Sequence, residues 1–201
     1  MSKTNFKQLL DSGVHFGHLK KKYNPAMAPY IFMERSGIHV IDLNKTIVML
    51  EDAAAALKQI AKSGKKILFV ATKKQAKGLI AEMAKSLNMP YINERWPGGL
   101  LTNFATIRKS IKKMQGIDKM KEDGTLDTLS KRERLQISRQ RAKLDVNFGS
   151  IVKMTRMPEA IFIVDTNKEH IALAEANKLG IRSFAMNDTN TNPNLVNFPI
   201  P

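Results

Sequence analysis

The chain contains no cysteine, which excludes disulfide bonds and thiolate metal sites. It also lacks any apolar run close to the ~18 to 20 residues that a membrane-spanning helix needs. The first eleven residues have neither the apolar segment of a secretory signal nor the arginine-rich, acid-poor character of a transit peptide. These absences predict a soluble, intracellular protein.

The glycine fingerprints of nucleotide-binding enzymes are missing as well. Gly98 and Gly99 are not followed by the third glycine of a dinucleotide-binding loop, and Lys66, after Gly64, stands where a P-loop needs Ser or Thr. Asp165 follows a buried strand, where a catalytic carboxylate often lies, but no second acid stands close by and a helix-capping role explains it equally well. A nucleotide-dependent α/β enzyme therefore remains only the alternative function.

Histidine is scarce and does not form a recognisable metal site. His15 and His18 are three residues apart and could share a metal ion, but no third ligand follows at a typical spacing. His39 lies in a predicted strand and is interpreted as a satisfied structural histidine, whereas His170 is expected to be exposed. We predict neither a metal nor a cofactor.

What the chain has in excess is positive charge. Thirty-three Lys and Arg residues stand against eighteen Asp and Glu residues, which gives a net charge of +15. Folding does not require such a charge, and self-repulsion makes it mildly costly, so it predicts a polyanionic partner. Nucleic acid is the first candidate, and an anionic membrane surface is the second.

Buried strands and amphipathic helices alternate along the chain, which is the pattern of βαβ units in one doubly wound parallel sheet of the α/β class. We expect strands at residues 38–43, 67–71, 90–92, 160–164 and 181–186, and helices at residues 4–12, 47–61, 72–87 and 166–179. Two capping boxes, Thr72 with Gln75 and Thr166 with Glu169, are expected to open the last two helices. Residues 13–29 are expected to be irregular, and residues 195–201 to form a surface strap or edge segment.

Residues 104–153 interrupt this alternation and are predicted to form an antiparallel helical hairpin. Two narrow apolar seams flank a turn at residues 122–124, and Ser130 with Glu133 forms a third capping box. From position 105 to position 153, thirteen Lys and Arg residues face six acidic residues, an excess of +7 that is close to half of that of the whole chain. The first seam contains Phe104, Ile107, Ile111 and Met114, and the second contains Ile137, Leu144, Phe148 and Ile151.

Two further groups of cations suggest contacts with phosphate. The stretch from His15 to Pro25 mixes lysines with aromatic and amide side chains, which suits phosphates, splayed bases and 2′-hydroxyl groups of RNA. Lys73 and Lys74, together with Lys45 and Lys168, are expected in first helical turns near the carboxyl edge of the sheet, where α/β folds bind ligands. A solvated surface is the competing interpretation for each of them.

Trp96 is the only tryptophan. It could stack on a base, but the favoured interpretation is that it anchors the base of the hairpin against the sheet, because buried area dominates what a tryptophan contributes.

Several long motifs resemble one family from end to end. They are Gly13-Val14-His15-Phe16-Gly17-His18, Gly37-Ile38-His39-Val40-Ile41-Asp42-Leu43, Asn93-Glu94-Arg95-Trp96 through Asn103, Asp188-Thr189-Asn190 and Pro199-Ile200-Pro201. In this order they are similar to the family of small-subunit ribosomal protein number two, in its bacterial type.

The resemblance implies a flavodoxin-like, doubly wound parallel five-stranded sheet with an inserted antiparallel helical hairpin. It also implies a structural role without catalysis near the head–body junction of the small ribosomal subunit in the cytoplasm. The implied partners are ribosomal RNA and neighbouring ribosomal proteins, including the large ribosomal protein number one, with no membrane and no small-molecule substrate. The corresponding regions are residues 1–36 (helix and RNA-contacting loop), 37–103 with 154–201 (sheet domain) and 104–153 (hairpin).

Charge and resemblance together give one set of predicted RNA-binding residues. They are His15, His18, Lys20, Lys21, Lys22, Tyr23, Asn24, Arg35, Lys73, Lys74, Arg95, Arg108, Lys109, Lys112 and Lys113.

Overall fold

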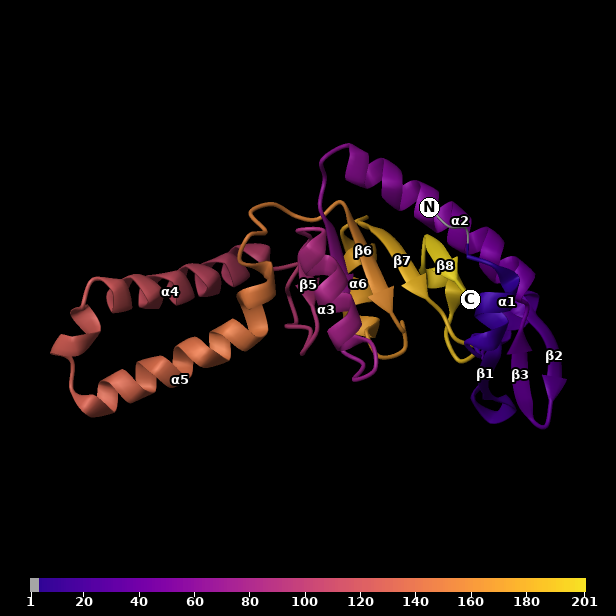
Figure 1. Ribbon diagram of the computed structural model, residues 1–201, viewed down its shortest axis with the longest axis horizontal. Coiled ribbons are helices and arrows are strands. Elements are labelled where there is room, and N and C mark those ends of the chain that lie inside the picture. The colour runs from indigo at the N-terminus through magenta and orange to yellow at the C-terminus, as the bar shows by residue number, and fades with distance from the viewer. Residues whose placement is uncertain (1–3) are drawn as a thin grey trace.

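The computed structural model describes residues 4–201, which form a central sheet with a different appendage at each end. A long helical hairpin extends from one end of the sheet, and a small antiparallel sheet lies at the other (Figure 1). None of the helices in this span is both long enough and apolar enough to cross a membrane.

The central sheet has five parallel strands in the order β5-β4-β6-β7-β8. The strands are β4 (Ile67–Val70), β5 (Tyr91–Ile92), β6 (Ala160–Val164), β7 (Arg182–Met186) and β8 (Phe198–Ile200). If these five strands are numbered along the chain, their order in the sheet is 2-1-3-4-5, which is the flavodoxin-like order. The predicted fold class is confirmed.

Helices cover both faces of this sheet because its strands are apolar on both sides. Leu68 faces a core that contains Ala172 and Ala176 of α6 (His170–Lys178). The preceding residue, Ile67, faces a second core with Ala53 and Ile60 of α2 (Leu43–Lys62). The remaining sheet helix, α3 (Lys77–Ser86), packs beside β5.

The first predicted strand exists but belongs to the small sheet. β3 (Ile38–Ile41) pairs antiparallel with both β1 (Phe16–Leu19) and β2 (Ile31–Arg35), so the expectation that it starts the parallel sheet is wrong. β8 supplies the fifth parallel strand instead, as an edge strand in which Pro199 is tolerated. The cause is a tight turn at Ser36 and Gly37, both with positive φ, which folds β2 back on β3.

The predicted irregular stretch 13–29 is therefore partly ordered. It contains β1 and two 3₁₀ turns, Lys20–Lys22 and Pro25–Tyr30. The predicted N-terminal helix is present as α1 (Phe6–Asp11), and a last 3₁₀ turn, Pro193–Leu195, precedes β8.

Two of the three expected capping boxes are wrong. The backbone N–H and the hydroxyl of Thr72 both donate to the carboxylate of Glu169, with the nitrogen at 3.1 Å. The Thr72 and Glu169 side chains are thereby bonded to each other, and neither caps its own helix. As a result α3 begins only at Lys77, and Lys73 and Lys74 are not in its first turn.

The hairpin forms as predicted, from α4 (Phe104–Glu122) and α5 (Lys131–Phe148). The turn at Gly124 has a φ of 73°, and the 3₁₀ turn Thr125–Thr128 follows it. The capping box of Ser130 and Glu133 is confirmed, since each side chain reaches the other's backbone. Another 3₁₀ turn, Gly149–Ile151, leads the chain back to the sheet.

Candidate nucleic-acid interface

The first candidate surface is the N-terminal basic turn, residues 18–24, which begins near the end of β1. Lys20, Lys21 and Lys22 are all exposed. Lys20 bonds Glu34 of β2 at 2.9 Å, and this hydrogen bond raises the pKa of Lys20. Lys21 and Lys22 form no ion pair with any of residues 4–201, so both are available to a phosphate. Arg35, at the end of β2, is equally exposed.

The basic turn is held against the loop that follows β7. The backbone N–H of His18 donates to the Thr189 hydroxyl at 2.8 Å, and Asn24 N–H donates to the Thr189 carbonyl at 3.0 Å. The His18 ring nitrogen Nδ1 lies 2.8 Å from Oδ2 of Asp188. Gly17 permits this approach, since a Cβ there would lie 2.5 Å from the Thr189 methyl carbon. His18 and Asn24 therefore position the turn and are only partly free to bind.

The histidine interpretations need one correction. His39 is 8% exposed, but neither of its ring nitrogens has a hydrogen-bond partner in the described chain, so it is not a satisfied histidine. Its ring instead packs against Tyr23, with 4.8 Å between the ring centroids. Tyr23 is therefore half-buried rather than free to stack on a base.

His15 is half-buried and packs against the neighbouring Phe16 ring at 4.0 Å between centroids. Within residues 4–201 no three side chains of the His, Cys, Asp or Glu type come together in a way that could hold a metal ion.

The second candidate surface lies on the hairpin. Lys109, Lys112 and Lys113 are exposed on α4, and none pairs with an acid in the described chain. Lys112 and Lys113 follow Lys109 by about one helical turn, and all three lie on the side away from the buried seam. Arg108 differs, because its guanidinium donates to the carbonyls of Val152 and Met154 at 3.4 and 3.3 Å. It fixes the return of the hairpin.

Trp96 anchors the base of the hairpin, as favoured from the sequence. It is 7% exposed, and its indole N–H donates to Glu175 of α6 at 3.0 Å. The same carboxylate accepts from the backbone N–H groups of Gly99, Leu101 and Thr102 at 2.8 to 3.0 Å. Burial raises the pKa of Glu175, but the bonds from Trp96 and the three N–H groups outweigh it and leave this pKa below its ordinary value.

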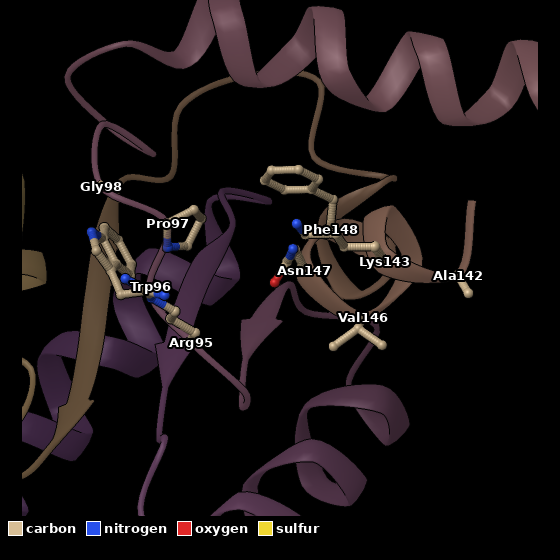
Figure 2. Close-up of a pocket in the computed structure, with 9 residues that line it drawn as sticks. All are labelled: Arg95, Trp96, Pro97, Gly98, Ala142, Lys143, Val146, Asn147 and Phe148. Carbon is tan, nitrogen blue, oxygen red and sulfur yellow. The ribbon is translucent and has the colours of Figure 1, made fainter. Parts of the chain in front are cut away.

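Arg95 stands beside this anchored loop and is exposed. It has no acidic partner among residues 4–201, and it faces α5 across the base of the hairpin (Figure 2).

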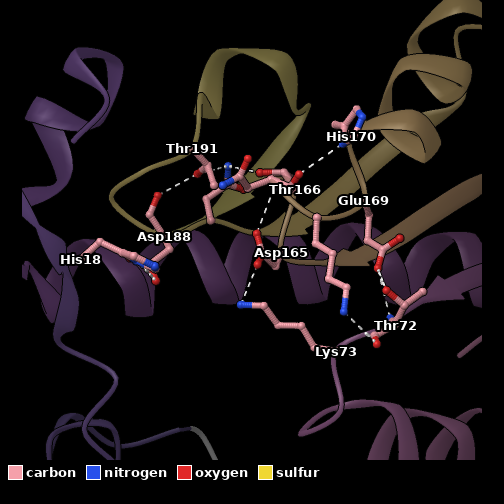
Figure 3. Close-up of polar contacts among 12 residues, drawn as sticks. His18, Thr72, Lys73, Asp165, Thr166, Glu169, His170, Asp188 and Thr191 are labelled. Atoms are coloured by element: carbon pink, nitrogen blue, oxygen red, sulfur yellow. Dashed lines mark hydrogen bonds and ion pairs between the residues drawn. The ribbon is translucent and has the colours of Figure 1, made fainter. Parts of the chain in front are cut away.

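The third candidate surface, at the carboxyl edge of the sheet, is largely occupied by the protein itself (Figure 3). Lys73 forms an ion pair with Asp165 at 2.6 Å, and Lys168 donates to the Thr72 carbonyl at 3.1 Å. Lys45, a member of the same expected group, donates to the Pro29 carbonyl. Lys74 alone of these lysines is exposed without a partner in the described chain.

These contacts cross the crevice between the carboxyl ends of β4 and β6, the point where flavodoxin-like sheets bind ligands. Thr72 and Glu169 bridge it, and Lys73 forms its ion pair with Asp165 across it. The crevice is therefore spanned by internal contacts, which weighs against the nucleotide-enzyme alternative.

Two acids hold these loops in a way that the sequence did not lead us to expect, Glu169 and Glu175. Both are buried, at 3% and 8% exposure. Glu175 falls among alanines on the inner face of a helix, a position that the periodicity of α6 marks as buried and that could have been noticed. Lys143 of α5 lies across the base of the hairpin from Arg95, and the sequence alone does not distinguish it from the other cations of the hairpin.

Comparisons with known proteins agree with the family resemblance of the sequence. The family model for ribosomal protein S2 matches residues 9–201. The small ribosomal subunit protein uS2 of Parabacteroides distasonis is 66% identical over 201 residues, which is all of this chain and 72% of the relative. The same figures hold for the uS2 protein of Bacteroides thetaiotaomicron. The uS2 protein of Azobacteroides pseudotrichonymphae is 62% identical over this whole chain and 77% of its own length.

Proposed function

The chain belongs to the ribosomal protein S2 family, and from this we infer that it is a structural, non-catalytic component of the small ribosomal subunit. The protein is accordingly located in the cytoplasmic ribosome, and its partners are ribosomal RNA and other ribosomal proteins. Nothing in the family supports the enzyme alternative.

Beyond that, we propose that the RNA contacts are made by two separated surfaces. The first is the basic turn, with Lys21 and Lys22 and the nearby Arg35. The second is the hairpin with its base, and its cations are Arg95, Lys109, Lys112 and Lys113. All of these side chains are exposed and unpaired in the described chain, so binding phosphate there breaks no internal contact.

Other predicted residues take supporting roles in this proposal. Arg108 and Lys73 bond within the protein and hold the loops on which free cations stand. His15, His18, Tyr23 and Asn24 shape the basic turn. Lys20 must exchange Glu34 for a phosphate if it is to bind RNA, and Lys74 adds a weaker contact at the carboxyl edge.

The arrangement of cations over the molecule carries the proposal. The carboxyl-edge crevice is bridged by Glu169 and Thr72, while lysines without a partner in the described chain stand on appendages at both ends of the molecule (Figure 1). An enzyme of this fold class would instead be expected to have an unbridged crevice with unpaired polar side chains at the carboxyl edge of the sheet. We further propose that the large ribosomal protein number one is among the neighbouring proteins, as the family resemblance implies.

The proposal is tested by reconstitution of small subunits from which this protein has been omitted. Added wild-type protein should sediment with the subunit in low salt. A protein with Lys21, Lys22, Lys109 and Lys112 all changed to Gln should remain in the unbound fraction. A variant with four other exposed lysines changed, at positions 58, 62, 85 and 178, should sediment like the wild type. Equal recovery of both variants would refute the assignment of the two surfaces.

A further inference from the structure

A groove lies at the base of the hairpin, between the loop before α4 and the last turns of α5 (Figure 2). Its volume is about 610 Å³, within the range of sites that hold small organic groups. Residues Arg95 to Gly98 line one side, and Ala142, Lys143 and Val146 to Phe148 line the other.

The chemistry of the two walls is mixed. Arg95 and Lys143 bring positive charge from opposite sides, and both are exposed without an acidic partner in the described chain. Val146 is 61% exposed, although it is aliphatic, and Pro97 is an apolar residue of the other wall. The side-chain amide of Asn147, half-buried, makes no hydrogen bond with the described residues. The groove therefore presents an apolar surface, an amide and two cations to a ligand.

We propose that an unpaired nucleotide of the bound RNA lies in this groove. Its base contacts Val146 and Pro97, its polar edge bonds the Asn147 amide, and its flanking phosphates lie on Arg95 and Lys143. The inference rests on the proposed function, and it adds a specific site for single-stranded RNA to general phosphate binding.

The charge of the surroundings favours RNA over a protein segment as the occupant. The hairpin carries an excess of +7, and no acidic side chain among the described residues lines the groove. A base offers an apolar face next to anionic phosphates, which matches both the Val146 wall and the two cations. A paired base has its edge and faces covered by its neighbours, so only an unpaired one can enter.

The loop wall is held in place before any ligand arrives. Glu175 fixes Trp96 and the N–H groups of Gly99 and Leu101, so Arg95 and Pro97 stand on a preorganised support. Because Trp96 lines the groove and is the only tryptophan, its fluorescence reports what happens there.

The experiment uses the full chain with small-subunit ribosomal RNA and with a short single-stranded oligoribonucleotide. Both RNAs should quench Trp96, whereas a blunt RNA duplex of the same length should not. Val146→Glu should abolish the quenching and weaken binding of the single strand at least fivefold. The matched control is Leu135→Glu, which adds the same charge at a site 52% exposed on the same helix and should change binding less than twofold.

Two further measurements keep the outcome decisive. Asn147→Ala, which removes the amide without changing any charge, should give the same loss if Val146→Glu fails to fold. A photoreactive amino acid placed at position 146 should cross-link to RNA in reconstituted subunits, and a cross-link to protein instead would overturn the inference. If ribosomal RNA binds without quenching Trp96, or if both Glu variants weaken binding equally, the groove site is wrong and the proposed function stands. If the wild type binds no ribosomal RNA, the proposed function itself fails, and the groove site fails with it.

Discussion

At the scale of single residues, Glu175 is the group on which the base of the hairpin depends. It is a buried carboxylate, 8% exposed, that accepts bonds from the Trp96 indole and from three backbone N–H groups. Buried N–H donors left without an acceptor are costly, so the carboxylate serves the loop as much as the loop stabilises the charge.

Acid should weaken this arrangement. The pKa of Glu175 is lower in the folded protein than the ordinary value of 4.5, so the folded state favours the ionised form. Its contribution to stability is fully present above about pH 4.5, the unfolded value, and is lost as the pH falls through the folded pKa. Glu175→Gln should lower the free energy of unfolding by roughly 1–3 kcal/mol at pH 7. It should also make the free energy of unfolding less dependent on pH in the acid range.

Urea unfolding at several pH values measures this effect. The control is Glu82→Gln, at an exposed position on α3, which should change stability by less than ~0.5 kcal/mol. If the free energy of unfolding depends on pH in the same way in the wild type and in Glu175→Gln, the role given to this carboxylate is contradicted.

The close approach at Gly17 leads to a second residue-scale prediction. A Cβ there would lie 2.5 Å from the Thr189 methyl carbon and 2.9 Å from the His39 carbonyl oxygen. Gly17→Ala should therefore destabilise the protein by roughly 1–3 kcal/mol through overpacking. Gly78→Ala, in α3 with open space around it, should instead stabilise by up to ~1 kcal/mol. Thermal unfolding compares the two, and a shift of the same sign in both would be evidence against the close packing of Gly17 on Thr189.

At the scale of elements, the basic turn and the hairpin separate binding from folding. In each, the cations are exposed while other residues hold the element in place. The turn is fixed through His18 and Thr189, and the hairpin is fixed through its seam and through Arg141, which bonds Asp118 of α4 at 2.9 Å.

For the basic turn, changing Lys20, Lys21 and Lys22 together to Gln should weaken ribosomal RNA binding and leave the melting temperature nearly unchanged. Among the described residues, this change removes one side-chain ion pair, that of Lys20 with Glu34, and solvent-exposed pairs of this kind contribute little to stability. Filter binding and calorimetry measure the two quantities. An unfolded triple variant would show that the turn is needed for folding.

In the hairpin, substitutions in the buried seam should reduce stability, whereas substitutions of the exposed lysines should reduce RNA affinity. Ile111 is fully buried, so Ile111→Ala should cost about 2–5 kcal/mol of stability. Changing Lys109, Lys112 and Lys113 to Gln should keep the stability and reduce RNA affinity about tenfold or more, because three phosphate contacts are removed. Denaturant unfolding beside RNA titration distinguishes them, and a loss of stability in the lysine variant would contradict the separation.

The elements also show what local pattern can and cannot predict. The hairpin, its capping box at Ser130 and the buried strands were all predicted, because each depends on residues close in sequence. The starts of α3 and α6 were not, because the Thr72 side chain bonds that of Glu169 from 97 positions away and neither side chain caps its own helix.

At the scale of the whole molecule, the sheet class was predictable and one strand pairing was not. Continuous apolar runs mark strands covered on both faces, so the parallel sheet follows from the sequence. β3 also alternates with a helix, yet the Ser36-Gly37 turn pairs it with β2 instead. For the site, exposed lysines were predicted by charge alone, whereas Lys73 and Arg108 are occupied by partners that only the folded chain brings near.

The central claim concerns the net charge of +15, which we attribute to contact with ribosomal RNA. The most direct test is the affinity of the wild-type protein for small-subunit ribosomal RNA at about 50 and about 200 mM salt. Because each phosphate contact releases counterions, about six or more contacts predict a loss of about a thousandfold or more over this range. An affinity that stays the same at both salt concentrations would contradict the account.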